Sequence, residues 1–276
     1  MKDFQYLLPQ TLEEAVKLKA EYDKAAVFMA GATDIVVRMR DYLLTPDAVI
    51  DLKKIPGLNG ITFSKKDGLH IGCLATMNEI AENNDVREYY PTLAAAAESV
   101  GSKQVRNRAT CVGNIVNASP LADTATPLYC YDAIVEIFGP EGKRELPITE
   151  FILFVRKVAL ERGEVVTGIR VPYREAKGEF RKIARRDQVD LSTVCGTVLK
   201  FGDEYHIAMG SVAPYPLRLK KTEELLSSKK LTKKLIEEAA KLAPTEVNPI
   251  DDVRASKQYR LDMVAYIVRD VLTKLA

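Results

Sequence analysis

The sequence is short of the residues from which metal sites and catalytic triads are usually built. Only two histidines occur in 276 residues, His70 and His206, and each lies in a strand-like stretch. We therefore expect no histidine-based metal site, no triad and no catalytic residue in this chain. The four cysteines are scattered without a CxxC pair, which argues against zinc and iron–sulfur sites. Cys73 and Cys195 lie in apolar segments and are expected to be buried thiols.

The chain also lacks an excess of charge and a long apolar run. Its 40 basic residues nearly balance 38 acidic ones, so it offers no electrostatic footprint for nucleic acid or an anionic membrane. No apolar run reaches the roughly 20 residues of a membrane-spanning helix. The first ten residues, MKDFQYLLPQ, resemble no signal peptide, and a cytoplasmic location is the expectation.

Strand-like and helix-like segments are mixed in the first 173 residues and separated in the remainder. We expect strands at 25–30, 48–52, 61–75 (a hairpin), 133–138 and 164–171, helices at 11–22, 33–40, 78–81, 92–100 and 119–131, and an irregular segment at 101–119. Beyond Pro172, strands within 178–213 precede helices at 219–226, 232–242 and 256–275. A run of strands followed by a run of helices is typical of a separate α+β domain. The sequence predicts an α+β protein with domains at 1–173 and 174–276, the first divided into subdomains of about 1–56 and 57–173 by Pro56-Gly57.

Two glycine-bearing stretches are the most informative local feature. In the first, Met29 to Ile35 (MAGATDI), a strand gives way to a turn and to a helix that Thr33 can cap; the second is Thr110 to Asn114 (TCVGN). Glycine lets backbone N–H groups approach a ligand closely, because it has no Cβ. Two such turns can face one diphosphate from both sides, which suggests a dinucleotide. Taken singly, each stretch can also be an ordinary turn between elements.

Two charged positions are ambiguous when they are read alone. Asp123 follows the predicted helix start at Ser119-Pro120, where an acid can stabilise the helix or accept hydrogen bonds from ribose hydroxyls. Lys182 and the pair Arg185-Arg186 lie near a predicted strand and can form a solvated face. A lysine aimed into a cleft would instead place positive charge beside a reduced, anionic ring.

In their order along the chain, these segments resemble a known family. The matching segments are Phe4-Gln-Tyr6 with Pro9, Ala30-Gly-Ala-Thr-Asp34, Gly101 to Asn107, Ala109-Thr-Cys-Val-Gly-Asn114, Asn117 to Asp123, Lys182 to Arg186, Gly210 to Pro214, and Ala255-Ser256 with Tyr259-Arg260. Over essentially its whole length the chain resembles the FAD-binding (medium) subunit of the molybdenum hydroxylases. That group contains xanthine dehydrogenase, nicotinate dehydrogenase and aerobic carbon monoxide dehydrogenase.

The resemblance implies a two-part FAD-binding domain of the vanillyl-alcohol oxidase (PCMH) type, followed by the family's C-terminal flavoprotein domain. Carried over residue by residue, the two pyrophosphate loops would be Met29, Ala30, Gly31, Ala32, Thr33, Asp34, Ile35 and Val36, and Thr110, Cys111, Val112, Gly113 and Asn114. Gly101 would border the flavin pocket and Asp123 would fix the cofactor. Val166 would be an apolar contact of the ring, with Lys182 near it.

Three departures from the family pattern stand out. Ala32 and Val112 replace glycines, and a β-branched valine resists positive φ, so Val112 is expected to be the more serious change. Phe154 to Lys157 stands where many relatives have a glycine-proline-glycine turn before a lysine. The cysteine-rich insertion of relatives with an extra iron–sulfur cluster in this subunit is missing.

The function implied by the resemblance is electron transfer within a complex. A large molybdopterin subunit would hydroxylate the substrate, a small subunit would relay electrons through two 2Fe–2S clusters, and FAD in this chain would pass them to an acceptor, with NAD⁺ expected. A dimer of such heterotrimers is the expected assembly. The alternatives are a free-standing flavin oxidase or reductase of the same fold and an assembly subunit that has lost FAD.

Overall fold

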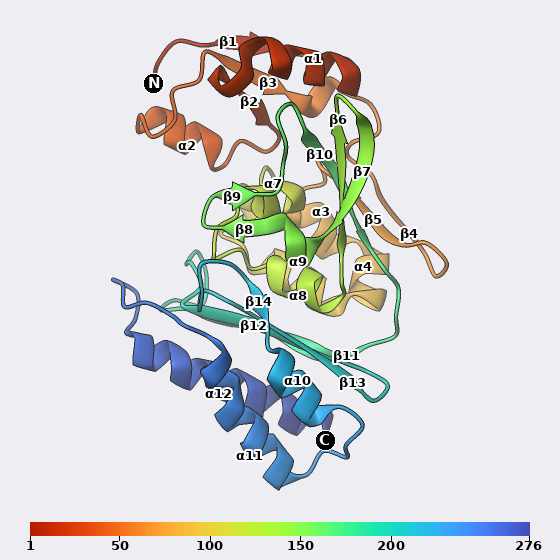
Figure 1. The fold of residues 1–276 in the computed structure, drawn as a ribbon, viewed down its shortest axis with the longest axis vertical. Helices are drawn as coiled ribbons and strands as arrows, with labels where there is room; N and C mark the ends of the chain where they lie inside the picture. Colours follow the sequence, from red (N-terminus) through yellow and green to blue (C-terminus); the bar gives the residue numbers. More distant parts are fainter.

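The computed structural model describes residues 1–276, and the chain begins with a small parallel sheet of order β1-β3-β2 (Figure 1). Its strands and the two helices beside them are β1 (Gln5–Leu7), α1 (Leu12–Tyr22), β2 (Ala26–Met29), α2 (Ile35–Arg40) and β3 (Ala48–Asp51). The predicted start of α1 is confirmed, since Thr11 Oγ1 accepts a hydrogen bond from the Glu14 N–H at 3.1 Å. The predicted cap of α2 is wrong, because that helix begins after Asp34 and has no side-chain cap.

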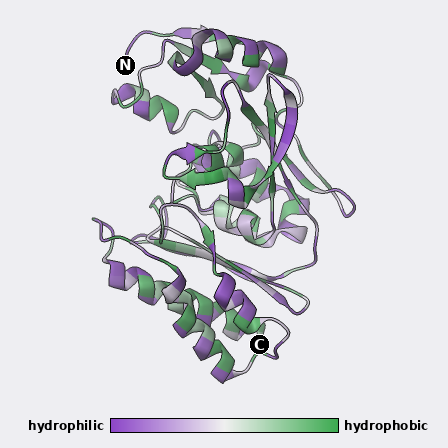
Figure 2. Cartoon of the chain, in the orientation of Figure 1, coloured by the Kyte–Doolittle hydropathy of each residue, from purple (hydrophilic) through white to green (hydrophobic).

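The largest sheet is antiparallel, with the strand order β4-β5-β10-β6-β7. Its strands are β4 (Ile61–Ser64), β5 (Gly68–Gly72), β6 (Ile134–Gly139), β7 (Gly142–Pro147) and β10 (Val165–Val171). The central strand β10 has a bulge between Val166 and Gly168. A bulge interrupts the alternation of side chains, and both Val165 and Val166 line the cavity described below. The edge strand β7 is largely hydrophilic (Figure 2), as suits a strand with one unpaired side.

Short helices lie between β5 and β6. They are α3 (Met77–Glu82), α4 (Asn84–Tyr89), α5 (Pro91–Glu98), α6 (Lys103–Arg106), α7 (Cys111–Val116) and α8 (Ala125–Cys130). Beyond β7 come α9 (Ile148–Phe151), β8 (Ile152–Phe154) and β9 (Lys157–Val158). The segment 101–119, expected to be irregular, contains α6 and α7. Both helices are short and begin at capping hydroxyls, those of Ser102 and Thr110, which a hydrophobic pattern does not reveal.

The helix predicted from Ser119 to Tyr131 starts later than expected. Ser119 Oγ accepts a hydrogen bond from the Leu121 N–H at 3.2 Å, so this serine caps a local turn, and α8 begins only at Ala125. Asp123 therefore lies in the turn before the helix. Thr124 Oγ1 donates to Asn114 Oδ1 at 2.7 Å and ties this turn to α7.

The last hundred residues form a four-stranded antiparallel sheet with three helices on one face (Figure 1). The elements are β11 (Lys177–Ile183), β12 (Val194–Phe201), β13 (Glu204–Gly210), β14 (Leu217–Arg218), α10 (Lys220–Leu226), α11 (Lys233–Leu242) and α12 (Lys257–Leu275). Almost every residue of β12 is buried, because α8 packs on one face of the sheet and α12 on the other. No helix in the structure is both long and apolar enough to cross a bilayer.

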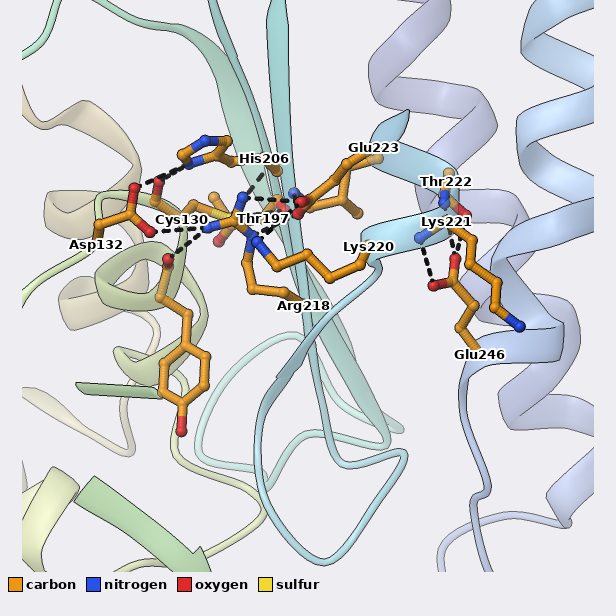
Figure 3. Close-up of polar contacts among 12 residues, drawn as sticks. Cys130, Asp132, Thr197, His206, Arg218, Lys220, Lys221, Thr222, Glu223 and Glu246 are labelled. Atoms are coloured by element: carbon orange, nitrogen blue, oxygen red, sulfur yellow. Dashed lines mark hydrogen bonds and ion pairs between the residues drawn. The ribbon is translucent and has the colours of Figure 1, made fainter. Parts of the chain in front are cut away.

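A charge network centred on the buried Arg218 joins this sheet to the end of α8 (Figure 3). Arg218 of β14 lies between Glu223 of α10, with Nη2–Oε2 at 2.9 Å, and Asp132 after α8, with Nη1–Oδ1 at 3.0 Å. His206 Nδ1 donates to the Cys130 carbonyl at 2.6 Å. Burial, followed by the nearby Arg218 charge, lowers the pKa of His206. The network fixes the C-terminal sheet against the preceding helices.

Candidate functional site

A cavity of about 410 Å³ opens between the first small sheet with α2, the helices α3 and α7, and strand β10. Its wall has 27 residues, 18 of them hydrophobic. A mostly apolar cavity of this volume with a few polar groups is typical of a small-molecule or cofactor site.

Most of the predicted site residues lie around this one cavity. Those in its wall are Met29, Ala30, Gly31, Ala32, Thr33, Asp34, Ile35, Thr110, Val112, Gly113, Asn114 and Val166. Gly101 is next to it, since the neighbouring Val100 and Val105 line the wall. Val36 lies in α2 and is exposed, and Cys111 is buried in the core. Asp123 and Lys182 lie outside the wall and contact each other.

The first glycine-bearing stretch packs against the residues just before the second. A Cβ added to Gly31 would lie 1.8 Å from the carbonyl oxygen of Arg108, two residues before Thr110. Glycine at position 31 is therefore required by the approach of the second segment, a reason different from the close ligand approach that the sequence suggests. Residues of both stretches line the same cavity, as two turns that face one ligand must.

The first stretch presents free backbone donors. The N–H groups of Gly31, Ala32, Thr33 and Asp34 donate to no acceptor within the protein. Ala32 has a left-handed backbone, with φ at 68°, and a left-handed residue in such a turn lets successive N–H groups converge on an anion. These residues are exposed or partly exposed and precede a helix, where backbone N–H groups have no partner within the helix. Consecutive free donors in the wall of a cavity can bind a ligand with acceptor oxygens.

The second stretch is the first turn of α7 rather than a loop. Thr110 Oγ1 accepts a hydrogen bond from the Gly113 N–H at 3.0 Å, while the Val112 N–H has no acceptor within the protein. Val112 has a helical backbone and no positive φ. The expectation that Val112 is the more serious departure is wrong, and the strained replacement is Ala32, because only Ala32 takes the left-handed conformation.

Both carboxylates in the wall are paired with arginines. Asp34 forms a two-point pair with Arg156, with atom separations of 2.9 and 3.1 Å. Glu164 forms one with Arg144, at 2.6 and 2.7 Å, and the hydrogen bond from Arg144 lowers the pKa of Glu164. Neither carboxylate leaves a free negative charge in the wall. Sequence reasoning missed both arginines, since nothing in their local sequence marks these partners.

A buried polar group outside the wall supports the first stretch. Lys53 Nζ contacts Asp51 Oδ2 at 2.6 Å and donates to the Ala30 carbonyl at 3.2 Å. The Tyr6 hydroxyl also donates to Asp51, which is fully buried at the end of β3. Burial raises the pKa of Asp51, but the hydrogen bonds from Lys53 and Tyr6 hold it below its usual value. The hydrogen bond from Lys53 holds the Ala30 carbonyl in place, just before the unpaired N–H groups of residues 31–34. In the sequence, the only sign of this buried group was that Asp51 ends the apolar strand β3.

Asp123 and Lys182 form a second buried pair, between the turn after α7 and strand β11. Lys182 Nζ donates to Asp123 Oδ2 at 2.8 Å and to the Ser99 carbonyl at 2.9 Å. The Ser192 hydroxyl donates to the other oxygen of Asp123. Burial raises the pKa of Asp123, and the Lys182 charge opposes that rise. The roles of Asp123 and Lys182 at a cofactor remain predictions.

The wall contains one thiol, that of Cys73. Burial raises the pKa of Cys73 to about 12, so the thiol is protonated at neutral pH. No group of three or more His, Cys, Asp or Glu side chains in the structure could hold a metal ion. The wall combines a mostly apolar surface with unpaired backbone N–H groups and has no unpaired carboxylate.

Comparisons with known proteins give one consistent result. Residues 2–174 match the family described as the FAD binding domain in molybdopterin dehydrogenase, and residues 179–275 match the CO dehydrogenase flavoprotein C-terminal domain. The chain is 32% identical to the xanthine dehydrogenase FAD-binding subunit of Escherichia coli O157:H7, over 99% of this chain and 97% of that one. It is 31% identical to the nicotinate dehydrogenase FAD-subunit of Eubacterium barkeri, over 100% and 98%.

A solved structure has the same fold. It is a chain of carbon monoxide dehydrogenase from Hydrogenophaga pseudoflava, which lacks the Mo-pyranopterin moiety of its molybdenum cofactor. The TM-score is 0.93 at 30% identity, and the match covers 98% of this chain and 96% of that one.

Proposed function

This chain belongs to the family of FAD-binding domains in molybdopterin dehydrogenases, and on that basis we propose that it binds FAD in the cavity described above. It is a flavoprotein oxidoreductase subunit of the xanthine dehydrogenase type. The observation that carries the cofactor assignment is the set of unpaired N–H groups of Gly31, Ala32, Thr33 and Asp34. Four donors without acceptors in a cavity wall fit a diphosphate, whose oxygens are all acceptors.

The residues of the wall divide the work of holding the cofactor. The N–H groups of residues 31–34 and of Val112 would bind the diphosphate. The apolar wall, including Phe28, Leu52 and Val166, would cover ring surface and exclude water. When bound, FAD supplies electron transfer in steps of one or two electrons. We keep Gly101, Asp123 and Lys182 as proposed contacts near the ring.

The partners and the acceptor are part of the same proposal. We propose that electrons arrive from 2Fe–2S clusters in a small subunit, after hydroxylation at molybdopterin in a large subunit, and leave to NAD⁺. Support comes from the relatives, whose names call them FAD-binding subunits or medium chains of dehydrogenases. The dimer of heterotrimers stays a proposal, as does the location in the cytoplasm.

We also propose a domain boundary near residue 174. The two family matches leave residues 175–178 between them. The larger hydrophobic core belongs mostly to residues before 174, and the second core of 17 buried residues lies wholly after it.

The proposal is tested by measuring FAD binding to the purified full-length chain. We expect one FAD per chain after reconstitution, a flavin absorbance spectrum, and a higher melting temperature, because a ligand at 100 times its Kd stabilises the folded state by about 2.7 kcal/mol. A folded chain that takes up no FAD would contradict the proposal and favour an assembly subunit. Substrate turnover by the isolated chain would favour a free-standing flavoenzyme.

A further inference from the structure

In the cavity wall, the negative charges are paired and one positive charge is not. The wall contains three charged residues, Asp34, Glu164 and Arg38. The two carboxylates are neutralised by arginines that do not line the cavity, Arg156 and Arg144. The remaining charge is therefore the single positive charge of Arg38.

Arg38 has no partner in the protein. It is half-buried on α2, and its guanidinium takes part in no ion pair and no hydrogen bond. Arg40 on the same helix is exposed and pairs with Asp41 at 3.1 Å. A guanidinium is always charged and carries five N–H donors, so an unpaired one beside an apolar wall favours an anionic ligand.

The position of Arg38 directs it toward the free donors of the first stretch. It lies one helical turn after Asp34, and side chains four residues apart lie on the same face of a helix. Side chains on a helix also lean toward its N-terminus, which here is the end that adjoins Gly31 to Asp34. The guanidinium and the unpaired N–H groups therefore face the same part of the cavity.

We propose that Arg38 is the counter-charge for the diphosphate of the bound dinucleotide and helps the site select nucleoside diphosphates. The inference rests on the proposed FAD site and adds a contact that the family resemblance does not assign. Backbone N–H groups carry no net charge, whereas a diphosphate carries two negative charges at neutral pH. A guanidinium neutralises part of that charge through two parallel hydrogen bonds.

The test compares Arg38→Gln with Arg40→Gln in the full chain, using ADP, FAD and adenosine as probes. We expect Arg38→Gln to weaken ADP and FAD binding by about tenfold to a hundredfold, the range of a charge-assisted hydrogen bond. Adenosine affinity should stay the same, because adenosine has no phosphate. Arg40→Gln should bind all three probes like the wild type, and Arg38→Lys should restore part of the loss.

Several outcomes would overturn the inference. One is unchanged ADP binding by Arg38→Gln; another is an equal loss for ADP and adenosine, which would place the guanidinium against the base. Melting temperatures of both variants show whether either is misfolded. If Arg38→Gln is misfolded, Arg38→Lys decides, and we expect it to bind ADP more weakly than the wild type. A wild-type chain that binds neither FAD nor ADP would overturn the FAD site itself. A wild type that binds both, beside an equally tight Arg38→Gln, would remove only the role of Arg38.

Discussion

Asp34 and Arg156 form a two-point ion pair across 122 positions of sequence, with Nη1–Oδ2 at 2.9 Å and Nη2–Oδ1 at 3.1 Å. Arg156 also donates to the side chain of Asn117, so one guanidinium connects the turn between β8 and β9 to the first glycine-bearing stretch and to the end of α7. Its own N–H donates to the Ala118 carbonyl at 3.0 Å, and its φ is 59°. The contact holds this hairpin against the rim of the cavity.

Arg156→Gln is expected to weaken FAD binding more than it weakens the fold. Both partners are about 40% exposed, so the pair contributes about 1 kcal/mol or less to stability. Its loss should free Asp34 and the hairpin, and FAD should dissociate several times faster. Stopped-flow release of FAD measures this. Arg269→Gln is the matched control, because Arg269 and Glu237 form a similarly exposed two-point pair between α12 and α11. Equal FAD release rates in the two variants would contradict the expected role.

Ala32→Gly is expected to stabilise the protein. Ala32 has φ at 68°, a conformation that costs a non-glycine residue about 1 kcal/mol, and glycine is also the residue of the family's motif. Denaturant unfolding should show a gain of up to about 1 kcal/mol without loss of FAD affinity. Ala32→Val should lower the free energy of unfolding. A less stable Ala32→Gly would show that the position is not strained.

Arg218→Gln is expected to destabilise the protein by about 3 kcal/mol, the lower end of the range for breaking a buried pair. The buried Glu223 loses its two-point partner and keeps only the Lys220 contact at 3.4 Å and the hydrogen bond from the Ile207 N–H at 2.8 Å. The side chains of Arg218 and Glu223 are only 4% and 8% exposed, respectively. Chemical unfolding, with Arg269→Gln again as the exposed control, gives the comparison. A decrease in the free energy of unfolding of less than about 1 kcal/mol would show that this pair contributes no more than an ordinary surface ion pair.

Acid unfolding should reveal a contribution from Asp252. Burial raises the pKa of Asp252, but the Arg254 N–H and the Arg260 guanidinium outweigh it and hold the value at about 2. A folded pKa below the unfolded value of 3.8 gives stability that is complete above pH 4 and is lost as the pH falls toward 2. Asp252→Asn should therefore be less stable than the wild type at pH 6, and the two should converge near pH 2. A difference that is the same at both pH values would contradict this titration.

The parts of the cavity wall that depend on local sequence could be predicted. The strand and turn at 26–34 follow from an apolar run ending in small residues, and the start of α1 follows from Thr11. The motif order identified the second segment, although its conformation was missed, because Gly113 and β-branched Val112 are poor helix formers and the cap of Thr110 decides the local structure.

The contacts that shape the site depend on the tertiary fold. Lys182 meets Asp123 over 59 positions, and Arg156 meets Asp34 over 122. No periodicity or spacing links such pairs, because the approach of two distant elements determines them. The need for glycine at position 31 was likewise hidden, since the obstructing atom is the carbonyl oxygen of Arg108.

The double coverage of β12 affects how the chain can be shortened. Thr126 of α8 forms a hydrogen bond with Thr197 of β12 at 2.9 Å, and Ala96 of α5 packs with Phe180 and Cys195. A fragment ending before β11 would expose these apolar surfaces to water and leave Asp123 without its lysine. Such a fragment is expected to aggregate, so engineering of the proposed FAD site requires the intact chain.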